Sequence, residues 1–197
     1  MTAASDAYAV SPHLVLGPTL LTERLILRPP AVEDFPRWAD FMADPETTRF
    51  IGGVQAPAQT WRLICTVAGM WALTGEGMFS ILERSTGLWV GRIGPLHPYG
   101  WPGREVGWSL HREATGKGYA VEAAGAAMTY AFDVLGWDDV IHCIDPDNLA
   151  SAAVARRLGS VNRGPGLLPE PFQDHAVDLW GQTRADWAKN RTRLNAP

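Results

Sequence analysis

Two glycines flank a lysine in the run Thr115-Gly-Lys-Gly-Tyr-Ala120, where a predicted strand meets a predicted helix. Apolar residues alternate over 104–111, which is typical of a strand, and small apolar residues recur at helical spacing over 118–135. Glycine allows a backbone to approach a ligand closely. The first turn of a helix has free N–H groups and a partial positive charge, which suit a phosphate group. The run therefore predicts a phosphate site built from main-chain N–H groups.

Neither of two common phosphate-binding motifs fits this run. A P-loop needs a glycine five positions before Gly116, where His111 stands, and a serine or threonine after Lys117, where Gly118 stands. The dinucleotide-binding motif needs a third glycine, and Val121 occupies that position. These departures disfavour an unrelated nucleotide-binding α/β protein.

A carboxylate lies on the predicted strand that comes before this run. In a half-buried groove, Glu105 would have its pKa raised toward neutrality, and such a carboxylate can act as a general base. The alternative is a structural glutamate that holds a loop or pairs with Arg104 or Arg92. The sequence leaves both roles open.

A second group of polar residues opens the predicted helix 149–158. Asn148 stands just before this helix, and Ser151 lies in its first turn. Both side chains can bind a ligand, and both residue types also cap helices.

The remaining pattern predicts an α/β protein with helices on both faces of one sheet. Strands are expected at about 21–28, 78–84, 88–95, 104–111, 138–144 and 176–181, and helices at about 32–43, 57–74, 118–135, 149–158 and 183–193. The Gly- and Pro-rich segment 159–171 is expected to be a connection. We expect a flexible leader over 1–18, a single domain over 19–187 and a C-terminal tail over 188–197.

Composition restricts the partners and the compartment. The formal net charge of −4 gives no support for a nucleic-acid or anionic-membrane partner. No apolar run is long enough to span a bilayer, and the N-terminus does not resemble a secretory signal. We expect Cys65 and Cys143 to be reduced core residues of a cytoplasmic protein. The five histidines are scattered, so no metal site is expected.

The run 115–120 resembles the pyrophosphate loop of the GCN5-related N-acetyltransferases (GNAT), which bind acetyl-CoA there. Further segments match in the family's order, especially its branch of ribosomal-protein N-terminal (Rim-type) acetyltransferases. They are Leu21–Arg28, Gly91–Gly94, Gly100–Gly103, Glu105–Trp108, Ile144–Ser151 and the pair Leu158-Gly159. The resemblance covers roughly residues 20–187. It implies a mixed, mostly antiparallel central sheet of six to seven strands with helices on both faces.

The resemblance also implies roles for individual residues. Coenzyme contacts are expected from Trp108, Ser109, Leu110, Thr115, Gly116, Lys117, Gly118, Tyr119, Ala120, Asn148 and Ser151. Glu105 would be the base, and Ser151 a candidate acid. Aromatic residues of segments that flank the family's acceptor groove, Trp71, Tyr99 and Trp101, are candidates for substrate contact.

Three positions depart from the family pattern. Thr115 stands where the family loop usually opens with glutamine or arginine, or with an aromatic residue in one branch. Ala155 stands where many relatives carry a tyrosine acid, and Ser160 replaces a phenylalanine after Leu158-Gly159. The absence of that tyrosine leaves the proton donor to Ser151, to water or to no group.

The implied function is acetyl transfer from acetyl-CoA directly to a primary amine, with the coenzyme in a V-shaped gap between the predicted fourth and fifth strands. The acceptor could be a protein N-terminus or a small molecule. The alternative is a non-catalytic acyl-CoA-binding sensor or partner module. A homodimer through the C-terminal strand and helix is one option for the oligomeric state.

Overall fold

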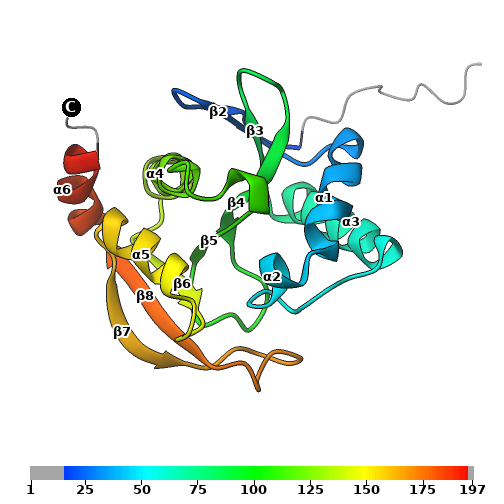
Figure 1. The fold of residues 1–197 in the computed structure, drawn as a ribbon. Helices are drawn as coiled ribbons and strands as arrows, with labels where there is room; N and C mark the ends of the chain where they lie inside the picture. The colour runs from blue at the N-terminus through cyan, green and yellow to red at the C-terminus, as the bar shows by residue number, and fades with distance from the viewer. Residues whose placement is uncertain (1–15, 195–197) are drawn as a thin grey trace, which may run out of the picture.

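The computed structural model describes residues 16–194, which form one sheet with helices on both faces (Figure 1). Within these residues the sheet has eight strands, in the order β1 (Leu20–Leu21), β2 (Leu25–Arg28), β3 (Phe79–Glu83), β4 (Trp89–Leu96), β5 (Glu105–Leu110), β6 (Asp139–Ile144), β8 (Val177–Thr183) and β7 (Val161–Gly166). Every neighbouring pair is antiparallel except β5 and β6, which are parallel. The predicted mixed, mostly antiparallel sheet is confirmed, with eight strands in place of six to seven.

Two local features account for the extra strands. The predicted first strand is divided, because Thr22 N–H donates to the Leu25 carbonyl and Leu25 N–H donates to the Thr22 hydroxyl, both at 3.0 Å. The segment predicted as a plain connection contains β7. An edge strand tolerates proline and glycine, and the β7–β8 register shifts between Asn162 and Pro165.

The helices divide between the two faces (Figure 1). A 3₁₀ turn, Val32–Asp34, leads into α1 (Phe35–Ala43), which lies with α2 (Pro45–Thr48) and α3 (Pro57–Thr74) on one side. The other side carries α4 (Tyr119–Asp133), α5 (Leu149–Leu158) and α6 (Arg184–Leu194), and a second 3₁₀ turn, Arg112–Ala114, follows β5. The prediction for α3 is confirmed at both ends. Gly75 ends that helix with φ +74°.

Each face has its own core. Small residues of α4, including Ala123 and Ala127, pack against the sheet without exposed surface. On the opposite face, Trp38 of α1 stacks on Trp89 of β4, with 5.5 Å between ring centroids. These two rings cover the face of the sheet on which Arg92 also lies.

The two cysteines differ in environment. Cys143, on β6, is partly buried, whereas Cys65 is exposed. The prediction that Cys65 is a core residue is wrong. The buried face of α3 carries Ile64 and Val67, and a residue one position along a helix is rotated by about 100° from its neighbour.

Most of the predicted leader lies outside the described residues. The part that is described lies against the domain, because Leu16 packs on the larger core and a Cβ at Gly17 would come within 2.5 Å of the Trp71 ring. At the other end, α6 continues to Leu194 and buries Trp187. Within residues 16–194, no helix has the length and hydrophobicity needed to cross a membrane.

Candidate active site

β5 and β6 pair at one register position only, Glu105 opposite Ile141. There Ile141 N–H donates to the Arg104 carbonyl at 2.9 Å. Two residues further along each strand, the next bond of a parallel ladder would join Cys143 N–H to the Val106 carbonyl. The pairing ends before that bond, and a side chain is bonded to each of its two groups.

The Glu105 side chain is bonded to the first of these groups. Its Oε1 accepts from Cys143 N–H at 3.1 Å, and its Oε2 accepts from the indole N–H of Trp101 at 2.6 Å. Burial raises the pKa of the Glu105 carboxyl above its ordinary value, and the two donated hydrogen bonds oppose that shift. Among the described residues Glu105 forms no ion pair, so the pairing with Arg104 or Arg92 that the sequence allowed is not formed.

The His142 side chain is bonded to the second group. Its Nδ1 lies 2.7 Å from the Val106 carbonyl oxygen, and its Nε2 lies 2.9 Å from the Ser160 hydroxyl. A carbonyl can only accept, so Nδ1 carries the proton and Nε2 accepts from Ser160. Burial lowers the pKa of His142 from 6.5 to about 4, so the ring is neutral at physiological pH. Trp108 packs on this ring, with 4.8 Å between centroids.

A chain of donors continues behind His142. Asn190 of α6 donates to the Gln182 side-chain carbonyl, and Gln182 donates to the Ser160 hydroxyl, each at 3.0 Å. Ser160 then donates to His142, which donates to Val106 in β5. Ser160 thus connects the C-terminal helix to the parted strands.

The parting exposes alternate backbone groups of β5. His111 N–H donates to the Val90 carbonyl in β4. Bonded residues alternate along an antiparallel pair, so Ser109 pairs with β4. Trp108 and Leu110 therefore present their N–H and C=O groups to the gap. Of the three residues predicted to bind the coenzyme through their backbone here, Ser109 has its N–H directed to β4 instead.

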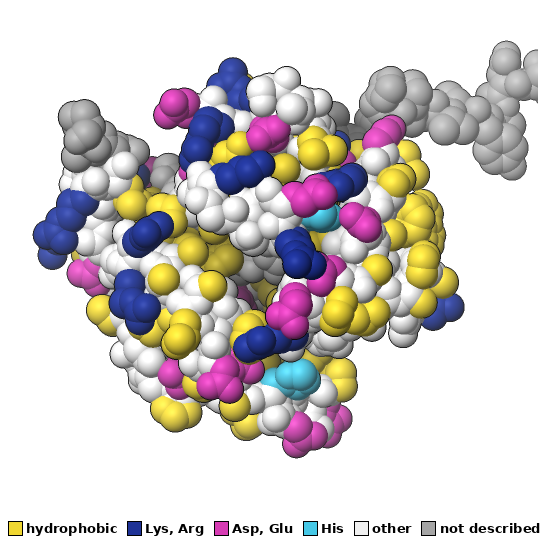
Figure 2. Space-filling view, in the orientation of Figure 1, with side chains coloured by type: hydrophobic (Ala, Val, Ile, Leu, Met, Phe, Trp, Pro, Cys, Tyr) yellow, Lys and Arg dark blue, Asp and Glu magenta, His cyan; other side chains and the backbone are white. Residues whose placement is uncertain are grey.

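Two cavities meet at the parted strands. The first, of about 230 Å³, is lined by Glu105, Trp101 and Arg92, among other residues. The second, of about 640 Å³, extends to the loop 115–120. Both are lined by Phe50, Ile51, Trp108, Ser109, Asn148 and Ser151, so they form one continuous groove. Figure 2 shows this face hollowed between the helices α4 and α5 on one side and α1 and α2 on the other.

The glycine loop closes the far end of the second cavity. Gly116 and Gly118 have φ values of +76° and +80°, which other residues rarely adopt. Gly118 is the residue before α4, and Arg24 holds the loop by donating to the Lys117 carbonyl at 2.9 Å. Thr115, Gly116, Gly118, Tyr119 and Ala120 line the cavity, but Lys117 does not. The Lys117 ammonium lies 5.9 Å from the ring of Tyr119.

The structure separates the roles of the two residues that open α5. Asn148 caps the helix, because its Oδ1 accepts from Ser151 N–H at 3.0 Å. The Ser151 hydroxyl has no hydrogen-bond partner among the described residues, although Ser151 lines both cavities. The cap therefore belongs to Asn148, and the serine hydroxyl is available to a ligand.

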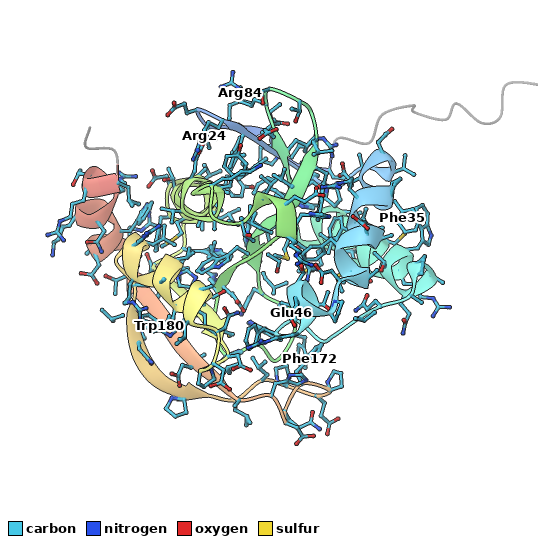
Figure 3. The ribbon with its side chains drawn as sticks, in the orientation of Figure 1. Arg24, Phe35, Glu46, Arg84, Phe172 and Trp180 are labelled. Carbon is cyan, nitrogen blue, oxygen red and sulfur yellow. The ribbon has the colours of Figure 1, made fainter. Side chains whose placement is uncertain are left out.

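Only one of the three predicted acceptor aromatics reaches the groove. Trp101 lines the first cavity, where its ring meets Phe172 edge-on at 6.4 Å between centroids; Phe172, labelled in Figure 3, belongs to the β7–β8 connection. Tyr99 is fully exposed and lines neither cavity. Trp71 is buried in the core and donates to the Met78 carbonyl at 3.0 Å. Substrate contact by Trp71 is thus excluded by its burial.

Sequence reasoning gave no role to His142, and it considered Arg92 only as a pairing partner of Glu105 and not as a residue that lines the site. For His142 the available indication was a single polar ring among the apolar residues that follow Asp139 in the strand Asp139–Ile144. For Arg92 it was a charged residue within the otherwise apolar Trp89–Leu96. Among the described residues, no group of three or more His, Cys, Asp or Glu could hold a metal ion.

Comparisons with known proteins agree with this geometry. The profile of the acetyltransferase (GNAT) domain matches residues 24–161. An uncharacterized N-acetyltransferase, p20, of Bacillus licheniformis is 30% identical over 166 residues, a match that covers 82% of this chain and 93% of that protein. The crystal structure of an acetyltransferase from Agrobacterium tumefaciens is 38% identical, with a TM-score of 0.73, and the match covers 84% of this chain and 95% of that one. A ribosomal-protein-S5-alanine acetyltransferase from Vibrio fischeri shares the fold, with a TM-score of 0.66 at 17% identity and coverage of 86% and 98%.

We expect the buried neutral His142 to make stability depend on pH. The unfolded chain binds a proton below pH 6.5 and the folded chain only near pH 4, so this contribution is complete above pH 6.5 and is lost as the pH falls toward 4. A difference of about 2.5 pKa units corresponds to about 3 kcal/mol. Urea unfolding at several pH values should show that the wild type loses about this much more stability than His142→Asn, which can still donate to Val106 but does not titrate. Equal pH slopes for the two proteins would contradict the assignment.

Proposed function

This chain belongs to the GNAT family of acetyltransferases, and we propose that it transfers an acetyl group directly from acetyl-CoA to a primary amine bound beside Glu105. The observation that carries the proposal is the continuous groove between β5 and β6. At one end of the groove lies the glycine loop 115–120, whose backbone N–H groups form a cradle for an anion, and at the other end lies the buried carboxylate of Glu105. The cradle suits a coenzyme pyrophosphate, and the carboxylate suits a reacting amine.

The residues present fit acetyl-CoA, which would supply the acetyl group as an activated thioester. Gly116 and Gly118 bring backbone N–H groups to the start of the 15-residue helix α4, where a pyrophosphate is stabilised. Arg112 and Arg157 line the same cavity and add positive charge. The free backbone groups of Trp108 and Leu110 suit the amide-bearing arm of the coenzyme.

Each remaining residue then has one task. Glu105, held by Trp101 and Cys143, keeps a free lone pair on each carboxylate oxygen and takes a proton from the amine as the new C–N bond forms. An N–H group in the gap, from Trp108 or Leu110, stabilises the negative charge that develops on the carbonyl oxygen. The Ser151 hydroxyl donates a proton to the departing sulfur and regains one from solvent.

Direct transfer is favoured over an acetylated cysteine. Cys143 is the cysteine that lines the first cavity. Its thiol pKa is raised, first by burial and then by the neighbouring Glu105. The nucleophilic form of cysteine is the thiolate, which this environment disfavours. Both cysteines are unpaired, which supports the cytoplasmic location included in the proposal.

The function is tested by measuring thiol release from acetyl-CoA with a panel of amines and peptides, and by identifying the acetylated product by mass spectrometry. Release that depends on the amine supports the proposal. Binding of acetyl-CoA by calorimetry, without release above the amine-free rate for any acceptor, would instead make the protein an acyl-CoA-binding module.

Glu105→Gln should lower kcat by roughly a hundredfold, because the amide has nearly the same shape but cannot take a proton. The wild-type kcat should fall at low pH with an apparent pKa above the ordinary glutamate value of 4.5, since burial raises the pKa of Glu105 and only the ionised form is a base. The variant should lack this acid limb and should bind acetyl-CoA normally. An unchanged pH profile in the variant would show that another group is the base.

Gly118→Asp should weaken acetyl-CoA binding by about tenfold or more, or about 1.4 kcal/mol. The substitution combines an unfavourable left-handed conformation with a negative charge beside the pyrophosphate. Gly118→Ala is the matched control, because it introduces the conformational strain without the charge. Calorimetry should give a smaller loss for alanine. Equal affinity of the wild type and the aspartate variant, both folded, would remove the pyrophosphate from this loop.

Ser151→Ala should slow the chemical step by roughly a hundredfold and leave the melting temperature unchanged, because the cap of α5 is the Asn148 side chain. Asn148→Ala should instead lower stability by about 1 kcal/mol. Single-turnover rates and thermal unfolding separate the two effects. Ser109 is the other hydroxyl shared by both cavities, so a slow Ser109→Ala with a normal Ser151→Ala would reassign the proton donor.

A further inference from the structure

Arg92 lies in the middle of β4, and its side chain lines the first cavity although the residue is only 9% exposed. Among the described residues no acidic side chain pairs with it and no group accepts a hydrogen bond from it. Its Nε is buried without a partner. The guanidinium carbon lies 5.8 Å from the centre of the Trp38 ring, which gives Arg92 a cation–π contact.

This environment differs from that of other arginines in the chain. Arg28, for example, pairs with buried Asp34 at 2.7 Å. Burying an unpaired charge is costly unless a partner compensates it. Burial lowers the pKa of Arg92 to about 10, so the side chain remains positively charged at neutral pH. An anion that enters the cavity would find a largely desolvated guanidinium with its donors free.

Arg92 and Glu105 point to the same side of the sheet. Arg92 is opposite Ser109, Gly94 is opposite Gly107, and Leu96 is opposite Glu105. Alternate residues of a strand share a face, so this face of the paired strands carries the guanidinium at one end and the carboxylate at the other. Ser109 and Glu105 are four residues apart, or about 13 Å between their Cα atoms.

Between the two charges Gly107 adds no side chain to the cavity wall, and the Glu105 carboxylate leans over it, with Oε1 3.3 Å from where a Gly107 Cβ would lie. The cavity, about 230 Å³, is below the usual range of about 300–1,000 Å³ for drug-sized ligands. The space is therefore small and has charges of opposite sign at its two ends.

We propose that this cavity takes a small amine that also carries a carboxylate, with the carboxylate on Arg92 and the amine toward Glu105. The inference rests on the proposed acetyl transfer and specifies its acceptor. The planar guanidinium can bind a carboxylate through two parallel hydrogen bonds, and Glu105 and Arg92 together match the opposite charges of an amino acid-like molecule.

The test uses a panel of L-amino acids and their carboxamides, which keep the amine and replace the carboxylate by an uncharged group. The kcat/KM for thiol release should favour the carboxylates in the wild type. Arg92→Gln should reduce the ratio of carboxylate to carboxamide kcat/KM by about tenfold or more, mainly through KM. Because each ratio is compared between two proteins, differences in amine basicity cancel.

Two further variants control the experiment. Arg92→Lys retains the charge and should recover part of the preference, which also keeps the test decisive if the glutamine variant folds poorly. Arg163→Gln removes a guanidinium that pairs with Asp139 on β6 and lines neither cavity, so the ratio should not change.

The inference is overturned if carboxamides or peptides are acetylated as well as free amino acids, or if Arg92→Gln keeps the wild-type ratio; the proposed function would survive either result. If no amine promotes thiol release, the proposed function fails by itself. Calorimetry of the same amino acids with the acetyl-CoA-loaded protein then decides the acceptor site. Binding that is lost in Arg92→Gln supports it, and absent or unaltered binding overturns it.

Discussion

The end of pairing between β5 and β6 after a single register position is the constraint on which the rest of the structure depends. A continued ladder would bond the Val106 carbonyl to Cys143 N–H and close the groove. Glu105 and His142 are bonded to these two groups instead, so neither the Val106 carbonyl nor Cys143 N–H is left unpaired where the strands part. The polar side chains of the site and the shape of the groove therefore have the same origin.

The site contains three buried ionisable side chains in three different environments. Glu105 accepts from two neutral donors and remains able to exchange a proton. In His142 both ring nitrogens are engaged, so the ring is a structural group and not a second base. Arg92 has free donors and faces a cavity. Burial alone therefore does not indicate function, because the number of hydrogen bonds that remain unmade distinguishes the three residues.

Local pattern was sufficient to predict much of this fold. α3 has uniform helical periodicity and a glycine stop, and the strand–loop–helix unit from Glu105 to Asp133 is a contiguous motif, so both could be read along the chain. β7 could not, because its Gly- and Pro-rich segment becomes a strand only by pairing with β8. The same limit applied to the site. The loop 115–120 and Glu105 were predictable, but the isolation of Arg92 and the burial of Trp71 depend on contacts between distant segments.

The proton on Nδ1 of His142 has a further consequence for experiment. It is buried and bonded to the Val106 carbonyl at the apex of the gap. Such a proton exchanges with solvent only when the structure around it opens. Its exchange rate, followed through the imidazole resonance, would therefore measure how often β5 and β6 separate at this point. The chain thus contains an internal spectroscopic probe of its own groove, at a position that requires no added label.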